Sequence, residues 1–137
     1  MKETLRYLLD TDTCIYLLNG NPQVKTHVSE SGVAALAVSI LTISELYFGA
    51  YNSSRVDANI QRIHDFLTPP GPEILSLSQT AAQYFGELKA DLHSKGQPVG
   101  DIDLLIAGIA KEYHLTVVTN NEKHFQRIPD LQIANWT

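Results

Sequence analysis

The feature that most constrains the fold is a set of short apolar runs, separated by longer stretches with the periodicity of helices. The run from 33 to 39 is rich in Val and Ala and is apolar on both of its faces. A strand of a parallel sheet that is covered by helices on both sides has this composition. Strands that alternate with helices along the chain predict an α/β layered fold.

The expected boundaries follow from the apolar pattern and from the turn and capping residues between the runs. Strands are expected at residues 5–9, 33–39, 73–77, 114–119 and 131–134. Helices are expected from a cap at Thr11 or Asp12 to about Leu18, from Pro22, over residues 44–51, 54–67 and 78–94, from Asp101, and within the segment 120–127. The segment 68–72, which contains three prolines, is expected to be a loop and not a domain linker.

The size and composition of the chain narrow the possible classes of protein. Its 137 residues predict one domain, 1–137, with a single core. The single cysteine, Cys14, excludes an internal disulfide and a Cys-rich zinc site, and a reducing cytoplasm fits it best. No secretory signal or membrane span is evident. The formal net charge of −5 argues mildly against nucleic acid, unless bound cations offset it.

Acidic residues stand where several of the expected elements begin or end. Asp10 closes the first apolar run, Glu45 lies at an apparent helix start, and Asp101 and Asp103 open another helix. Ligands of an open α/β sheet bind beyond the carboxyl ends of its strands, where such carboxylates can converge. A carboxylate cluster without Cys or His partners suits Mg²⁺ or Mn²⁺. Metal-assisted phosphate chemistry is therefore the first hypothesis.

Each of these acids also has a structural alternative. Asp10 is equally compatible with a helix N-cap. Thr42 and Glu45 fit a capping box, which favours a capping role for Glu45 when that segment is taken alone. Asp101 follows a glycine and is expected to be the N-cap or a supporting residue. Asp103 lies where capping is less natural, so we expect Asp103 to be the ligand.

Polar residues also follow the expected strand at 114–119. Thr119 and Asn121 offer hydroxyl and amide groups that can hold a water or a phosphate oxygen, and Glu122 and His124 can point into the same cleft. A polar turn and a solvated short helix are the structural alternatives. Tyr7, Tyr47, Phe48, Tyr51 and Trp136 are interpreted as packing residues of a core or an interface, not as platforms for base stacking.

A competing hypothesis comes from the order of residues after the first strand. The segment from Asp10 to Thr13 resembles the Asp-x-Asp start of haloacid-dehalogenase-type phosphatases, in which the first Asp is a nucleophile and the second, here Asp12, a general acid. The later acids of those enzymes follow an apolar strand, whereas Asp101 and Asp103 follow a loop. A four-residue motif also has a high rate of false positives.

Taken together, the motifs resemble those of PIN-domain ribonucleases of the VapC toxin type, in the same order and over essentially the whole chain. The resemblance rests on Leu-Asp-Thr-Asp at 9–12, on Glu-Leu-x-x-Gly-Ala at 45–50, and on the segment 96–107 with the metal-binding Asp at 103. It continues with Val-Thr-Asn-Asn at 118–121, His-Phe at 124–125 and Asn-Trp at 135–136. Asp12 replaces the usual Asn, and His124 replaces a frequent fourth acid.

The resemblance implies a three-layer α/β/α domain with a central, mostly parallel sheet. It also implies a metal-dependent endoribonuclease, the toxin of a type II toxin–antitoxin pair, in which Asp10, Glu45 and Asp103 hold one or two Mg²⁺ or Mn²⁺ ions. The expected partners are an RNA substrate, a cognate antitoxin and a second copy of the chain in a homodimer. A degenerate PIN domain that only binds is the further alternative. The RNA target, such as a particular tRNA, is not encoded in any residue pattern that we recognise.

Overall fold

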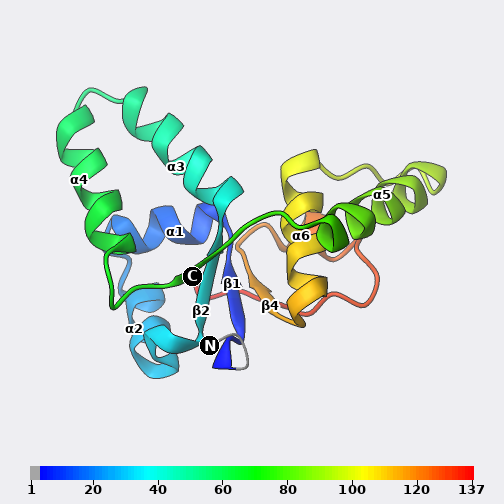
Figure 1. The fold of residues 1–137 in the computed structure, drawn as a ribbon, viewed down its shortest axis with the longest axis horizontal. Helices are drawn as coiled ribbons and strands as arrows, with labels where there is room; N and C mark the ends of the chain where they lie inside the picture. Colours follow the sequence, from blue (N-terminus) through cyan, green and yellow to red (C-terminus); the bar gives the residue numbers. More distant parts are fainter. Residues whose placement is uncertain (1–3) are drawn as a thin grey trace.

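Five parallel strands form the centre of the computed structural model, which describes residues 4–137, in the order β3-β2-β1-β4-β5 (Figure 1). The strands are β1 (Tyr7–Leu9), β2 (Leu36–Ser39), β3 (Glu73–Leu75), β4 (Thr116–Val118) and β5 (Ile133–Ala134). The helices are α1 (Thr11–Leu18), α2 (Pro22–Ser31), α3 (Ile40–Tyr51), α4 (Val56–Leu67), α5 (Gln79–Ser94), α6 (Asp101–Tyr113) and α7 (Glu122–Phe125). The three-layer α/β/α architecture with a parallel sheet is therefore confirmed.

The two faces of the sheet are covered by different groups of helices. Leu8 points into one apolar cluster, which includes residues of α5, α6 and α7. Its neighbour Leu9 points into a second cluster, which includes residues of α1 to α4. Successive side chains of a strand alternate between faces, so a strand that is apolar throughout contributes to both clusters. Figure 1 shows α3 and α4 on one side of the strands and α5 and α6 on the other.

Several element boundaries differ from the predicted ones. The predicted strand at 33–39 begins only at Leu36, because Val33–Ala35 forms a 3₁₀ turn. α3 begins at Ile40, four residues before the predicted start at 44, and Ser39 is its N-cap. The N-cap of α1 is Asp10, so the capping alternative for Asp10 is confirmed and the prediction of a cap at Thr11 or Asp12 was wrong.

The predicted role of the aromatic residues as packing residues is confirmed for some and not for others. Trp136 is 5% exposed and lies edge-on to Tyr7, with ring centroids 4.9 Å apart. Phe48 and Tyr51 on α3 are 70% and 67% exposed, so they are not part of the core of one chain. Whether these two side chains lie in an interface between copies remains a prediction.

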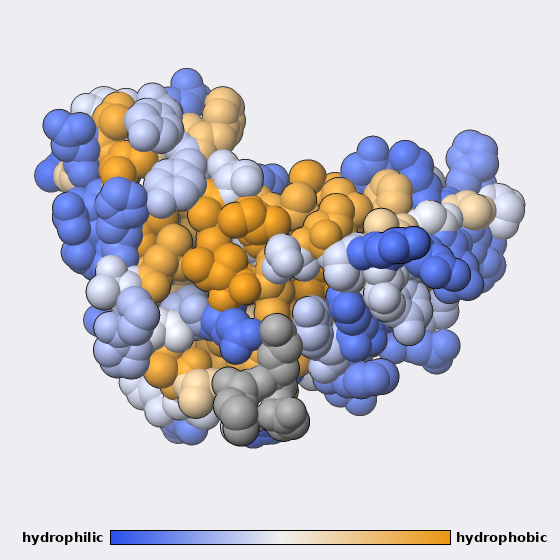
Figure 2. All heavy atoms as spheres, in the orientation of Figure 1, coloured by the Kyte–Doolittle hydropathy of each residue, from blue (hydrophilic) through white to orange (hydrophobic). Residues whose placement is uncertain are grey.

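No helix within residues 4–137 is long and apolar enough to span a membrane. Apolar side chains gather on one face of the molecule, between the helix pair α3 and α4 and the helix pair α5 and α6 (Figure 2). Ile40 begins α3, Ile74 lies in β3 and Leu77 follows β3, and these three apolar residues are exposed, at 42%, 46% and 39%. We refer to these three residues together as the apolar face.

Candidate active site

Asp10 lies directly after β1, at the edge of the sheet that the carboxyl ends of the strands form. Leu9 pairs with Val38 of β2 on one side and with Val118 of β4 on the other. Because the strands are parallel and in register, the residues that follow them lie at the same level. Thr119 is therefore placed beside Asp10, as expected for a site beyond the strand ends.

The carboxylate of Asp10 is buried and hydrogen-bonded. Its side chain is 4% exposed, and its Oδ1 accepts the backbone N–H of Thr13 at 2.8 Å. Burial raises the pKa of Asp10 above its ordinary value, and the nearby charge of Asp12 raises the pKa further. Hydrogen bonds from the hydroxyl of Thr119 and from Thr13 oppose this rise, because they stabilise the charged form.

Asp103 reaches the same place from the first turn of α6. Its side chain is half-buried, and this burial is the largest reason why the pKa of Asp103 is raised. The charge of Asp10 raises the pKa as well, His124 lowers it, and Glu45 and Asp12 raise it by smaller amounts. Four acids and one histidine from distant parts of the sequence therefore lie near enough to act on one another electrostatically.

Glu45 lies in the second turn of α3 and does not cap that helix. The backbone N–H of Thr42 donates to the hydroxyl of Ser39 at 3.0 Å, so the capping box predicted for Thr42 and Glu45 was wrong. The exposed carboxylate of Glu45 instead accepts a hydrogen bond from the hydroxyl of Thr11, in the first turn of α1. This contact turns Glu45 toward the segment that follows β1.

Thr119, Asn121 and His124 form a connected group beside the carboxylates. Thr119 is fully buried, and its hydroxyl accepts the backbone N–H of Asn121 at 2.8 Å while it also bonds to Asp10. The side-chain amide of Asn121 lies 2.9 Å from Nδ1 of His124. A continuous set of hydrogen bonds thus joins Asp10 to the short helix α7.

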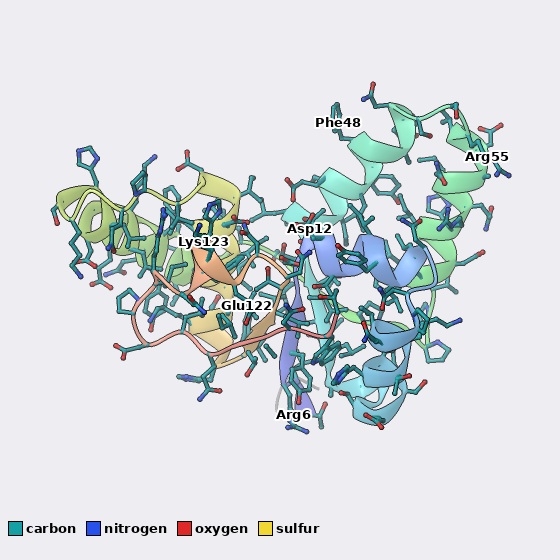
Figure 3. The ribbon with its side chains drawn as sticks, turned by 180° about the vertical axis from the view of Figure 1, so that it is seen from behind. Arg6, Asp12, Phe48, Arg55, Glu122 and Lys123 are labelled. Carbon is teal, nitrogen blue, oxygen red and sulfur yellow. The ribbon has the colours of Figure 1, made fainter. Side chains whose placement is uncertain are left out.

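Two of the predicted site residues are oriented toward other partners. Asp101 accepts a hydrogen bond from Nζ of Lys89 at 2.9 Å, and both side chains are exposed. Gly100 is the residue that precedes α6, so Asp101 is not the N-cap and that prediction was wrong. Glu122 is exposed and accepts the side-chain amide of Asn135 at 3.1 Å. Figure 3 labels Glu122 on α7 and Asp12 on α1, with Arg6 at the opposite end of β1.

The sequence did not single out Thr11 as a site residue, and it gave Asp12 only as the general acid of the phosphatase alternative and as the residue that replaces the usual Asn. Thr11 holds Glu45, and the charge of Asp12 acts on both Asp10 and Asp103. A signal was present, because both residues lie in the first turn of a helix that starts at the sheet edge. The first turn of a helix that directly follows a strand lies at the edge of the sheet where the strands end, so polar residues in this turn lie near the site whether or not they cap the helix.

The donor atoms of the site are oxygens and one histidine nitrogen. Cys14 is fully buried in the core, and burial raises the pKa of its thiol, so it offers no thiolate. Among residues 4–137 no three His, Cys, Asp or Glu side chains form a ready-made metal cage. Mg²⁺ does not require one, because it keeps several waters and binds proteins through one or two carboxylates. Asp10 and Asp103 fit an ion of this kind.

A groove of about 230 Å³ adjoins the site between α1, α3 and α4. It includes Glu45 but neither Asp10 nor Asp103, and most of its other lining residues are apolar. The guanidinium of Arg62 forms part of its wall, where it donates to the carbonyl oxygen of Leu18 and to the side chain of Asn19. The groove is thus acidic at Glu45 and apolar over most of its length.

Comparison with known proteins identifies the family. The PIN domain profile matches residues 7–131. The chain belongs to the PIN domain family. The tRNA(fMet)-specific endonuclease VapC of Salmonella typhimurium is 36% identical to this PIN domain protein over 135 residues, which cover 96% of this chain and 98% of the relative. Ribonuclease VapC2 of Rickettsia felis is also 36% identical, over 132 residues that cover 95% of this chain and 97% of the relative.

Solved structures agree with these relatives. The PIN domain superimposes with a TM-score of 0.90 on a chain in the crystal structure of DNA-bound VapBC from Salmonella typhimurium, at 34% identity. The match covers 97% of this chain and 99% of that one. A chain of VapBC2 from Rickettsia felis, bound to a promoter fragment, gives a TM-score of 0.86 at 34% identity. The family resemblance read from the motifs is therefore confirmed.

Proposed function

We propose that this PIN domain protein is a metal-dependent endoribonuclease and the toxin of a toxin–antitoxin pair, with Asp10, Glu45 and Asp103 as its catalytic carboxylates. The names of its relatives, which are VapC ribonucleases, support the activity on RNA. The observation that carries the assignment to these residues is electrostatic. The charges of Asp10 and Glu45 both raise the pKa of Asp103, so the three carboxylates share one small region.

Carboxylates that are buried together, with raised pKa values, are poised to bind a cation. Asp10 and Asp103 would hold Mg²⁺ or Mn²⁺, and Glu45 would contact the ion directly or through water. Such an ion, when bound, activates a water molecule and stabilises the negative charge that develops on the phosphate. The number of ions, one or two, depends on whether Asp12 or another oxygen compensates for His124 at the position of the usual fourth acid.

The surrounding residues would fix these carboxylates and orient the substrate. The hydroxyl of Thr119 and the backbone N–H of Thr13 hold the carboxylate of Asp10 in one orientation. His124 lies close enough to Asp103 to lower the pKa of that carboxyl. No covalent intermediate on the protein is needed, and the buried Cys14 takes no part.

Two other readings of the site receive less support. The phosphatase hypothesis requires Asp12 as a general acid, but the relatives that match over nearly the whole chain are ribonucleases. A degenerate PIN domain that only binds is disfavoured by the presence of Asp10, Glu45 and Asp103 at one edge of the sheet. Calorimetric titration with Mn²⁺ distinguishes a degenerate PIN domain from a metal-dependent ribonuclease, because a degenerate site does not bind Mn²⁺ at millimolar concentrations.

Cleavage of total cellular RNA tests the proposed activity. The purified chain is incubated with Mg²⁺ or Mn²⁺, with EDTA in a parallel sample and with the Asp103→Asn variant as the matched control. We expect discrete fragments that disappear with EDTA and in the variant, and the fragment ends then identify the target RNA. Fragments that persist in both controls would contradict the assignment, because cleavage would then depend neither on a metal ion nor on Asp103.

The proposed partner is a cognate antitoxin. The matched chains from Salmonella typhimurium and Rickettsia felis were solved as VapBC bound to DNA, which supports a partner of this kind. An arginine of the antitoxin would suit the carboxylates electrostatically, and an apolar segment would suit the adjoining groove. A 1:1 mixture with the product of the neighbouring gene should cleave RNA much more slowly. Undiminished cleavage would contradict the partnership.

We also propose a homodimer. The apolar face of Ile40, Ile74 and Leu77 leaves apolar area in contact with water, and surfaces of this kind commonly mark interaction sites. Light scattering during gel filtration should give twice the mass of 15.2 kDa. The variant Ile74→Glu should shift the mass to that of one chain, and a monomeric wild type would contradict the proposal.

A further inference from the structure

The last six residues of the chain, 132–137, run past the loop that leaves β4. We call these residues the C-terminal strap. The backbone N–H of Val117 donates to the carbonyl oxygen of Gln132 at 2.9 Å, and that of Thr119 donates to the carbonyl oxygen of Ala134 at 2.9 Å. The strap therefore extends the sheet as far as Thr119, the residue whose hydroxyl holds Asp10.

Trp136 fixes the far end of the strap. Its indole is 5% exposed, lies edge-on to Tyr7 of β1 and stacks on His27 of α2, with centroids 5.1 Å apart and planes 6° apart. A large aromatic side chain that is buried in this way contributes strongly to packing. The strap is thus anchored on both sides of Asn135, by the backbone bonds before it and by Trp136 after it.

The side-chain amide of Asn135 has one orientation because its two ends have different partners. Its Oδ1 accepts hydrogen bonds from the backbone N–H and the hydroxyl of Thr137, at 3.0 and 2.6 Å. This leaves Nδ2 to donate to Oε2 of Glu122 at 3.1 Å. Glu122 is the first residue of α7. The strap is therefore hydrogen-bonded to the first residue of α7.

The segment 119–122, which the strap contacts at both of its ends, carries polar groups of the candidate active site. The strap bonds to the backbone of Thr119 at one end of the segment and to the side chain of Glu122 at the other. Asn121 lies between them, donates its backbone N–H to the hydroxyl of Thr119 and contacts His124 through its side chain. A displacement of α7 would therefore move His124 relative to Asp103.

We propose that Asn135 is a positioning residue that, through Glu122, holds α7 so that Asn121 and His124 face the carboxylates. This inference rests on the proposed ribonuclease function, which it deepens by giving the strap a role in the same site. Within residues 4–137, the side chain of Asn135 bonds to Glu122 and Thr137 and not to Asp10, Asp103 or His124, so its effect on cleavage passes through Glu122.

The substitution Asn135→Asp tests the hydrogen bond between Asn135 and Glu122 with little other change. An aspartate still accepts both hydrogen bonds from Thr137, but it places a second carboxylate against Glu122. We expect kcat to fall about tenfold, since small misplacements of site groups have effects of this order or larger. KM should change less than twofold. The melting temperature should change by no more than about 2 °C, because both side chains are exposed.

A swap of the two functional groups provides the rescue. In the double variant Asn135→Asp, Glu122→Gln, the amide and the carboxylate exchange sides, so a hydrogen bond can form again between the same two positions. We expect kcat of the double variant to return to within about threefold of wild type, which is the non-additivity of a directly coupled pair. The variant Gln132→Glu is the matched control, because it adds one negative charge to another exposed residue of the strap, whose side-chain oxygen contacts the hydroxyl of Thr116 at the start of β4.

Two measurements keep this test separate from that of the proposed function. Cleavage of the mapped RNA gives kcat and KM, and amide hydrogen exchange of residues 121–126 in the resting protein reports on α7 without any substrate. A slowed Asn135→Asp variant with faster exchange, rescued by the swap, supports the inference. An Asn135→Asp variant with wild-type kcat and exchange, a swap without rescue, or an equal loss in Gln132→Glu overturns it. If the wild type cleaves no RNA, the proposed function fails, and exchange alone then decides whether the strap holds α7.

Discussion

Two substitutions at Asp10 separate the structural role of its carboxylate from its proposed catalytic role. Asp10 is the N-cap of α1 and accepts the backbone N–H of Thr13, which is itself 1% exposed. Asparagine keeps an oxygen in the capping position and removes the charge. Alanine removes both the cap and the charge. If Asp10 also holds the metal ion, both variants lose cleavage, although only the alanine variant loses the cap.

The difference in stability between the two variants can be worked out from these contacts. Loss of an N-cap costs about 0.5–2 kcal/mol, and a buried N–H without a partner costs about 1–3 kcal/mol. These two figures describe the same lost bond, so we expect Asp10→Ala to be about 2 kcal/mol less stable than Asp10→Asn. For a chain of 137 residues the entropy of unfolding is about 0.29 kcal/mol/K, which converts this difference to about 7 °C. Asp10→Asn should melt at or above the wild type in EDTA, because burial disfavours the charge that it removes.

Thermal unfolding in EDTA and cleavage of the target RNA with Mn²⁺ are the paired assays. The reasoning predicts two inactive variants, with the alanine variant melting well below the asparagine variant. Equal melting temperatures would show that the hydrogen bond to Thr13 contributes no net stability. Cleavage at the wild-type rate by Asp10→Asn would refute the catalytic role of Asp10.

Three further predictions follow from the same geometry. Glu45→Gln should abolish most cleavage but change the unfolding free energy by no more than about 0.5 kcal/mol, because Glu45 does not cap α3. A loss of ~1 kcal/mol of stability together with full cleavage activity would instead support the capping role. The pKa values of Asp10 and Asp103 are raised, so the folded chain binds protons more tightly than the unfolded chain, and the contribution of these two groups to stability in EDTA falls as pH rises above the ordinary pKa of aspartate. The gain in melting temperature of the Asp10→Asn and Asp103→Asn variants over the wild type should therefore shrink in acid. A gain that does not change with pH would contradict this. Gly108→Ala should cost about 2 kcal/mol or more, since its Cβ would lie 2.6 Å from a carbonyl oxygen of α5, whereas Gly86→Ala, with open space at its Cβ, should be neutral or stabilising in a denaturant titration.

The architecture and two of the site residues followed from simple rules applied to the sequence. The run at 33–39 is apolar on both faces, which only a covered parallel strand requires, and parallel strands end at a common edge. This reasoning places Asp10 at that edge, and the structure brings Asp103 to it from the start of α6. Short apolar runs separate strands from helices well when turn residues bound them.

Local capping signals were less informative, because several residues in a row can cap a helix. Ser39, Thr42 and Ser44 all have hydroxyl groups suited to the N-cap, and the sequence pattern favoured the box formed by Thr42 and Glu45. The structure uses Ser39, since β2 ends there and the chain can enter α3 without an intervening loop. The choice depends on where the strand stops, which is set by pairing with its neighbours.

Contacts between distant segments were beyond the reach of sequence patterns. The hydrogen bond between Thr11 and Glu45 joins residues of two helices that are 34 positions apart in the sequence, and that between Glu122 and Asn135 joins the start of α7 to the strap. Neither pair has a distinctive spacing or composition. Such pairs exist because the sheet order brings their elements together, so they become visible only once the topology is known.

The central claim is that Asp10 and Asp103 hold the metal ion on which RNA cleavage depends. The most direct test measures, on the same samples of wild type and Asp103→Asn, the calorimetric binding of Mn²⁺ and the single-turnover cleavage rate over the same range of Mn²⁺ concentration. The account predicts that binding and cleavage of the wild type rise together, and that the folded variant shows neither. Cleavage by the wild type without metal, or an Asp103→Asn variant that binds Mn²⁺ and cleaves RNA as the wild type does, would contradict it.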